Sequence, residues 1–128
     1  MMDVTEKKTW EMVLDLWKHL GTNDYSNKFI RDINDSLSVY PSRLKNHVLM
    51  KLGYDGCMHG CPFCEYFSCS KGCPLGSRDD ISAGCWNYNY NFWEIDMYGY
   101  AKHNRYYALK FYHELIIVFI SRCMEEKL

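Results

Sequence analysis

The sequence lacks an excess of either charge, a long apolar run and a phosphate-binding glycine loop. Fifteen Lys and Arg oppose sixteen Asp and Glu in 128 residues, whereas a protein that binds nucleic acid mainly through its phosphates carries a large basic excess. The longest apolar run, 115–120, is six residues long, and a membrane span needs about 18. The chain is too short for a barrel enzyme, and without a glycine loop it does not fit a dinucleotide fold.

A secretory signal is also missing, because the first 20 residues carry Glu6, Glu11 and Asp15. We therefore expect a cytoplasmic protein, whose thiols stay reduced or bind metal. No common nucleophile motif is present. His103 and His113 have no visible cleft or acid–base partner, so we interpret both as surface or helix-face residues. The sequence predicts a protein that is not an enzyme.

Apolar spacing predicts a small helical bundle. The first helix has Asp3 and Glu6 as a capping box and Gly21 as its stop. A second helix is expected over about 26–38, ending at 40–41, and a third from Ser42, ending before Gly53. The inward faces of the first and third are predicted to be Trp10, Val13, Leu14, Trp17 and Leu20, and Leu44, Val48, Leu49 and Leu52.

A long last helix is predicted over about 104–124, with a strand over 115–120 as the alternative. Its wide buried face comprises Ala108, Phe111, Tyr112, Leu115, Ile116, Phe119, Ile120 and Cys123. On this interpretation Cys123 is an ordinary core thiol. The other six of the seven cysteines fall within 57–85, where no helical or strand periodicity exists. Ordering such a loop costs roughly 1–2 kcal/mol of backbone entropy per residue, so we infer that the loop is cross-linked.

Zinc is the favoured cross-link, because a tetrahedral site takes four thiolate or imidazole ligands, often from short-spaced pairs. The preferred ligands are Cys61, Cys64, Cys73 and Cys85, and a set with Cys69 in place of Cys85 is the nearest alternative. Cys57 and His59 are held in reserve. Four protein ligands leave no open position for water or substrate, which predicts a structural rather than a catalytic site.

Three other arrangements of the cysteines remain open. Six thiolates suffice for two bridged zinc ions, and a disulfide network would be expected in a secreted protein. The spacing of Cys57, Cys61 and Cys64 matches that of radical S-adenosylmethionine enzymes, and Cys73-Pro74 matches the end of a ferredoxin motif. An iron–sulfur redox or sensor protein is therefore an alternative.

An aromatic stretch follows Cys85 and supplies interaction-surface candidates: Tyr88, Tyr90, Phe92 and Trp93. Aromatic side chains are common in protein interfaces. Near Arg105 and Lys110 they could also stack on unpaired bases, which makes a nucleic-acid-binding module an alternative. A third interpretation is that they pack over the bundle and the metal loop.

The chain resembles a group of small phage and prophage proteins. The likeness covers about 61–120 and rests on Cys61-Pro62-Phe63-Cys64, Phe67, Cys69, Gly72-Cys73-Pro74-Leu75, Gly84-Cys85, a downstream Tyr–Trp pair and a C-terminal amphipathic helix. Cys57 and His59 lie outside the shared pattern. Small phage proteins often act by binding a host protein, so the resemblance implies a protein partner in the host cytoplasm.

Together these observations predict one mainly α domain, 1–128, built as a small helical bundle with an inserted, irregular, cysteine-rich metal-binding loop. Its parts are N-terminal helices (1–53), the metal loop (54–86), and an aromatic segment with the C-terminal helix (87–128). The predicted function is that of a non-catalytic, zinc-stabilised protein-interaction module, as a phage-encoded modulator of a host protein, without a membrane partner.

Overall fold

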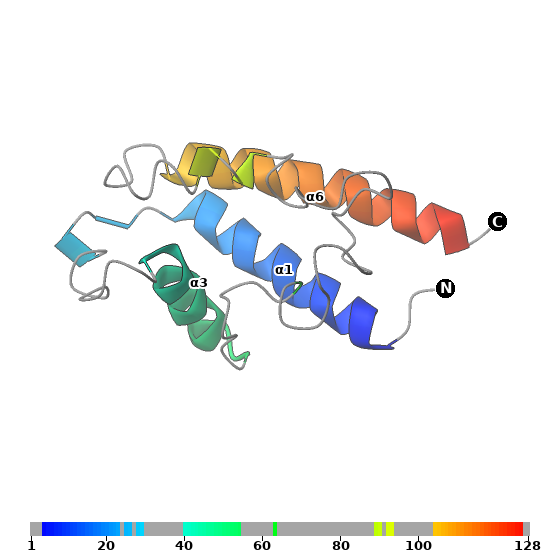
Figure 1. Cartoon of the computed structure of the whole chain (residues 1–128), viewed down its shortest axis with the longest axis horizontal. Helices are drawn as coiled ribbons and strands as arrows, with labels where there is room; N and C mark the ends of the chain where they lie inside the picture. The colour runs from blue at the N-terminus through cyan, green and yellow to red at the C-terminus, as the bar shows by residue number, and fades with distance from the viewer. Residues whose placement is uncertain are drawn as a thin grey trace.

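The computed structural model describes residues 4–23, 25–26, 28–29, 40–54, 63, 89–90, 92–93 and 104–126. Three helices make up most of this part: α1 (Val4–Thr22), α3 (Tyr40–Lys51) and α6 (Asn104–Glu126) (Figure 1). The residues described include no strand, which confirms the mainly α prediction for them and excludes the strand alternative over 115–120. The predicted helix over 26–38 falls mostly outside the described residues, as does most of 54–86.

The first helix, α1, packs against both α6 and α3. Its inward residues follow the expected spacing, and Leu16 and Met12 widen the buried face. The end of α1 corrects the sequence prediction, because the helix continues through Gly21 to Thr22. The last carbonyls are satisfied by side chains: Thr22 Oγ1 donates to the Lys18 carbonyl at 2.8 Å, and Asn23 Nδ2 donates to the His19 carbonyl at 2.9 Å.

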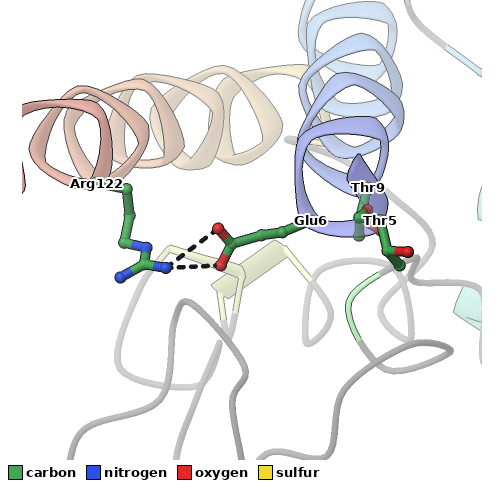
Figure 2. Close-up of polar contacts among 4 residues, drawn as sticks. All are labelled: Thr5, Glu6, Thr9 and Arg122. Atoms are coloured by element: carbon green, nitrogen blue, oxygen red, sulfur yellow. Dashed lines mark hydrogen bonds and ion pairs between the residues drawn. The ribbon is translucent and has the colours of Figure 1, made fainter. Parts of the chain in front are cut away.

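Gly21 instead lies where the backbones of α1 and α6 approach each other closely. An added Cβ at Gly21 would lie 3.0 Å from the Leu109 Cα and 3.1 Å from the Leu109 nitrogen. At the other end of the pair, Arg122 Nη2 donates to both carboxylate oxygens of Glu6, at 2.9 and 3.1 Å (Figure 2). The two contacts show that α1 and α6 run antiparallel.

The contact with Arg122 gives Glu6 a role that the predicted capping box did not include. Asp3 lies outside the described residues, and the Glu6 carboxylate is engaged by Arg122 of α6. Glu6 is buried although it carries a charge, and the guanidinium stabilises that charge where water is scarce. Glu6 therefore joins two helices, in addition to any contribution to its own helix start.

The start of α3 also differs from the prediction. The helix begins at Tyr40, so Pro41 lies in its first turn, where a missing backbone N–H and a fixed φ are tolerated. Ser42 is consequently inside the helix and is not its cap. The end at Gly53 is confirmed: this glycine has φ 93°, and the Gly53 and Tyr54 amides donate to the carbonyls of Met50 and Leu49.

The core is formed by all three helices and by residues 63, 90 and 93. Leu44, Val48 and Leu49 of α3 are fully buried, whereas Leu52 is exposed, contrary to expectation. In α6 the buried apolar side chains are Ala108, Phe111 and Leu115. Cys123 packs against the core as predicted, and Ile120 is exposed rather than buried. In the described part of the chain, no helix is both long and apolar enough to cross a membrane.

Candidate functional site

The predicted metal ligands Cys61, Cys64, Cys73 and Cys85, and the reserve residues Cys69, Cys57 and His59, lie outside the described residues. Within the described ranges, no group of three or more His, Cys, Asp or Glu side chains could hold a metal ion. Cys123 is described and is a free, half-buried thiol. The zinc site thus stays a prediction from the sequence. Phe63, which lies between Cys61 and Cys64 in the sequence, is the described residue nearest to the predicted ligands.

Phe63 is the residue immediately before Cys64, and its side chain is buried in the helical core. Only 1% of Phe63 is exposed. Its ring meets the Trp10 ring of α1 edge-on, with 4.8 Å between centroids and an interplanar angle of 80°. The Trp10 ring also contacts Phe119 of α6 at 5.2 Å. The chain between the first two predicted zinc ligands is therefore anchored where α1 and α6 pack together.

The structure corrects half of the predicted aromatic surface. Tyr90 and Trp93 are buried, Trp93 completely. Both rings meet Trp17 of α1 nearly at right angles, at centroid distances of 5.6 and 4.8 Å, and Trp17 also contacts Phe111 of α6 at 4.8 Å. For these two residues the alternative of packing over the bundle holds, because their apolar area fills the core between the helices.

Polar contacts fix residues 89–90 and 92–93 on the bundle. The Asn89 backbone N–H and its Nδ2 both donate to Glu114 Oε1, at 2.8 and 2.9 Å, and the Trp93 amide donates to the Asn89 carbonyl at 3.0 Å. Glu114 thus positions this turn on α6. The side chain of its neighbour His113 is exposed as interpreted, and His103 lies outside the described residues.

Lys45 is a buried charge that sequence reasoning missed. Only 3% of the residue is exposed. Lys45 Nζ donates to the Tyr90 hydroxyl at 2.8 Å and lies 4.7 Å from the centroid of the Tyr90 ring and 5.9 Å from that of Trp93. A buried ammonium needs such partners. The sequence did not indicate that Lys45 is buried, because lysines commonly lie beside the buried face of a helix, as Lys45 lies beside Leu44.

Phe92 remains as an exposed member of the predicted surface, with 54% of the residue accessible; Tyr88 lies outside the described residues. The Phe92 ring stacks on Tyr107 at 5.8 Å with an interplanar angle of 24°, and Tyr107 meets Tyr106 at 5.1 Å. Lys110 Nζ lies over the Tyr106 ring at 4.6 Å. We call Phe92, Tyr106, Tyr107 and Lys110 the aromatic patch.

Two polar clusters along α1 were also not foreseen. Tyr54 Oη donates to Asp15 Oδ2 at 2.5 Å. Partial burial, followed by the hydrogen bond to Asp15 and the charges of Asp15 and Glu11, raises the pKa of Tyr54 well above its usual value. In the last turn of α1, His19 Nε2 and Tyr25 Oη are 2.6 Å apart.

The surroundings of His19 change its pKa. Burial, together with the positive charges of Lys51 and His47, lowers the pKa of His19. The low pKa favours the neutral imidazole, which can share one hydrogen bond with the Tyr25 hydroxyl. The two clusters tie Tyr54 and Tyr25 to α1.

Comparisons with known proteins add no relative. The chain matches no family model, no curated protein and no solved structure. The functional interpretation therefore rests on the residues and contacts described above.

Proposed function

We propose that this protein is a non-catalytic, zinc-stabilised protein-interaction module that acts in the cytoplasm on a host protein. The observation that carries the proposal is the burial of Phe63 against Trp10. Cys64 follows Phe63 directly, and consecutive Cα atoms are about 3.8 Å apart. A zinc ion bound by Cys64 would therefore lie close to the α1–α6 pair, and metal binding would be coupled to the packing of the helices.

The energetics favour a metal over the loop's own packing. A structural zinc site contributes roughly 10–16 kcal/mol of apparent binding free energy at neutral pH. Burial of one phenylalanine such as Phe63 contributes about 3–5 kcal/mol, judged by truncation to alanine. One anchored ring contributes little against the entropy of ordering a six-cysteine segment, and a metal site contributes several times as much. We retain Cys61, Cys64, Cys73 and Cys85 as the proposed ligands.

Metal analysis of protein purified without added metal tests the proposal. We expect about one zinc per chain and no visible absorbance. Cys61→Ser and Cys64→Ser should lose the metal, whereas Cys123→Ser is the matched control and should keep it. A brown protein absorbing near 400 nm would support the iron–sulfur alternative instead. Unfolding that responds to reductant alone, with no metal released by a chelator, would establish disulfides.

The aromatic patch is the proposed contact surface for the host protein. Its exposed rings are held in place by Tyr107 stacking and by the Asn89–Glu114 contacts, so little side-chain entropy is lost on binding. Affinity capture from host extract, followed by titration of the identified protein, tests this. Phe92→Ala should weaken binding by about tenfold or more, and the exposed Met50→Ala on α3 serves as control.

A nucleic-acid-binding module is the second candidate, favoured by the Lys110 ammonium over the exposed Tyr106 ring. Base–aromatic stacking contributes about 1–3 kcal/mol per base, and basic side chains contact the phosphates. Salt-sensitive binding of a single-stranded oligonucleotide that is lost in both Phe92→Ala and Lys110→Ala would establish it. Binding that is absent at low salt would exclude it.

A further inference from the structure

Tyr25 and Phe29 connect the end of α1 to the other two helices. His19 Nε2 of α1 and Tyr25 Oη are 2.6 Å apart, and the Tyr25 ring contacts the Phe29 ring at 5.2 Å. The Phe29 ring meets the His47 ring of α3 at 5.2 Å, with an interplanar angle of 67°. The Tyr25 carbonyl accepts a hydrogen bond from Asn104 Nδ2, at the start of α6. We call His19, Tyr25, Phe29 and His47 the histidine cluster.

The histidine cluster contains bases but no acidic partner for them. Among the described residues, neither imidazole pairs with a carboxylate, and Lys51 of α3, whose charge also acts on His19, forms no ion pair. Asp15 lies one turn before His19 on α1, but its carboxylate accepts a hydrogen bond from Tyr54. From α6, Asn104 contacts the cluster and carries no charge. The described groups around His19 are thus neutral or basic: Tyr25, His47, Lys51 and Asn104.

A proton on His19 would meet burial and like charge together. Burial, followed by the positive charges of Lys51 and His47, lowers the pKa of His19. The exposed Lys18 and Lys28 are further bases on the same segments. A histidine with a lowered pKa in the folded state contributes its full stability above the ordinary value of 6.5, and this stability is lost as the pH falls from 6.5 toward the folded-state pKa. Mild acid therefore acts against the packing around His19.

Helix α3 is the element that this effect reaches most easily. The first helix, α1, packs more extensively on α6 than on α3, and α3 is only 12 residues long. Isolated helices of about 12–15 residues are marginal in water, so α3 depends on its packing contacts. Elements with few buried contacts open first in a folded protein. The contact between Phe29 and His47 therefore lies where a change in charge can separate two elements.

We propose that the histidine cluster is an acid-sensitive device that holds α3 against α1 at neutral pH and releases it in mild acid. Protonation of His19 and His47 places two imidazolium charges beside the ammonium of Lys51. Separation of α3 from α1 lets water and salt screen these charges. The device depends neither on the metal nor on the aromatic patch proposed above.

Two measurements on the full chain test the device. In an NMR titration of the imidazole signals, the midpoint of His19 should lie below 6.5. Hydrogen exchange, corrected for its intrinsic pH dependence, should show that α3 opens more often in acid, by up to about tenfold for each pH unit between that midpoint and 6.5. A midpoint at or above 6.5, or opening of α3 that does not depend on pH, would overturn the proposal. An equal increase in all three helices would overturn it too, because it would indicate global unfolding.

Three variants separate the charge of His19 from other effects of acid. His19→Gln keeps a side chain that can bond the Tyr25 hydroxyl but takes no charge, so the opening of α3 should lose most of its pH dependence. Lys51→Gln, at an exposed position, should raise the His19 midpoint and weaken the acid response. His113→Gln removes an exposed histidine of α6 and, as the matched control, should open as the wild type does.

The comparison of the wild type with His19→Gln also cancels any effect of pH on a bound metal, because both chains carry the same cysteines. Circular dichroism at neutral pH verifies that each variant is folded. If His19→Gln opens α3 in acid as the wild type does, or if Lys51→Gln leaves the His19 midpoint unchanged, the proposed device is wrong.

Discussion

The close approach of α1 and α6 at Gly21 predicts whether Gly21→Ala raises or lowers the free energy of unfolding. Inside an exposed helix, replacing Gly by Ala stabilises by about 1 kcal/mol, because Ala restricts the unfolded chain. At Gly21 the new Cβ would lie 3.0, 3.1 and 3.2 Å from the Cα, N and Cβ of Leu109. Carbon atoms normally pack at about 3.5–4.0 Å, and none of these three atoms can rotate away.

Gly21→Ala must therefore separate the two helices by several tenths of an ångström. Such overpacking costs about 1–3 kcal/mol, which exceeds the gain in propensity, so we expect a net loss of about 1 kcal/mol. Urea unfolding followed by circular dichroism at 222 nm measures it. Leu109→Ala keeps all three contacted atoms and should not rescue the variant. A more stable Gly21→Ala protein, or rescue by Leu109→Ala, would refute the reasoning.

Three further substitutions test individual contacts by chemical unfolding. Tyr90→Phe removes the hydroxyl that accepts a hydrogen bond from buried Lys45 and should lower the free energy of unfolding by about 1–3 kcal/mol. A smaller effect of Tyr90→Phe in a protein that already carries Lys45→Met would confirm that the two side chains are coupled. Glu6→Gln weakens the contact with Arg122 and should cost about 1 kcal/mol, with a smaller effect in high salt, because the guanidinium is partly exposed. Tyr54→Phe should change how the free energy of unfolding depends on pH in alkali. The raised pKa of Tyr54 means that the stability linked to its neutral form is complete below pH about 10 and is lost as the pH rises through the folded-state pKa. The variant should therefore lose less stability than the wild type between pH 8 and 11, and equal losses would contradict this.

The inner faces of the helices could be predicted because they depend on local periodicity. Trp10, Val13, Trp17 and Leu20 are buried as the spacing of one helix face requires, and Gly53 ends α3 because it adopts the left-handed conformation that a side chain would strain. Helix starts and stops were less certain. Gly21 had the sequence signature of a helix end, but only the position of Leu109 shows that a small side chain is needed there for packing.

Contacts between distant parts of the chain could not be predicted from the sequence. Tyr90 lies in a stretch where aromatic residues alternate with asparagine, and Trp93 ends it directly after Phe92; this pattern fits a strand, an exposed surface or a covered turn equally well. Trp17, Phe111 and Lys45 decide among these because they enclose both rings. The exposure of Ile117 and Ile120 on α6 could not be predicted for a related reason: the isoleucines at 116, 117 and 120 look alike in the sequence, and only the position of α1 shows which side of the helix is covered.

The pairing of Glu6 with Arg122 also has a consequence during synthesis on the ribosome. The two residues are 116 positions apart, so the helix that covers most of α1 is the last of the described helices to be made. At about 5–20 residues per second, α1 waits on the order of 6–20 s for α6. Throughout that interval Trp10 and Trp17 lack their partners on α6, and nascent chains are most exposed to chaperones and to mispairing at this stage.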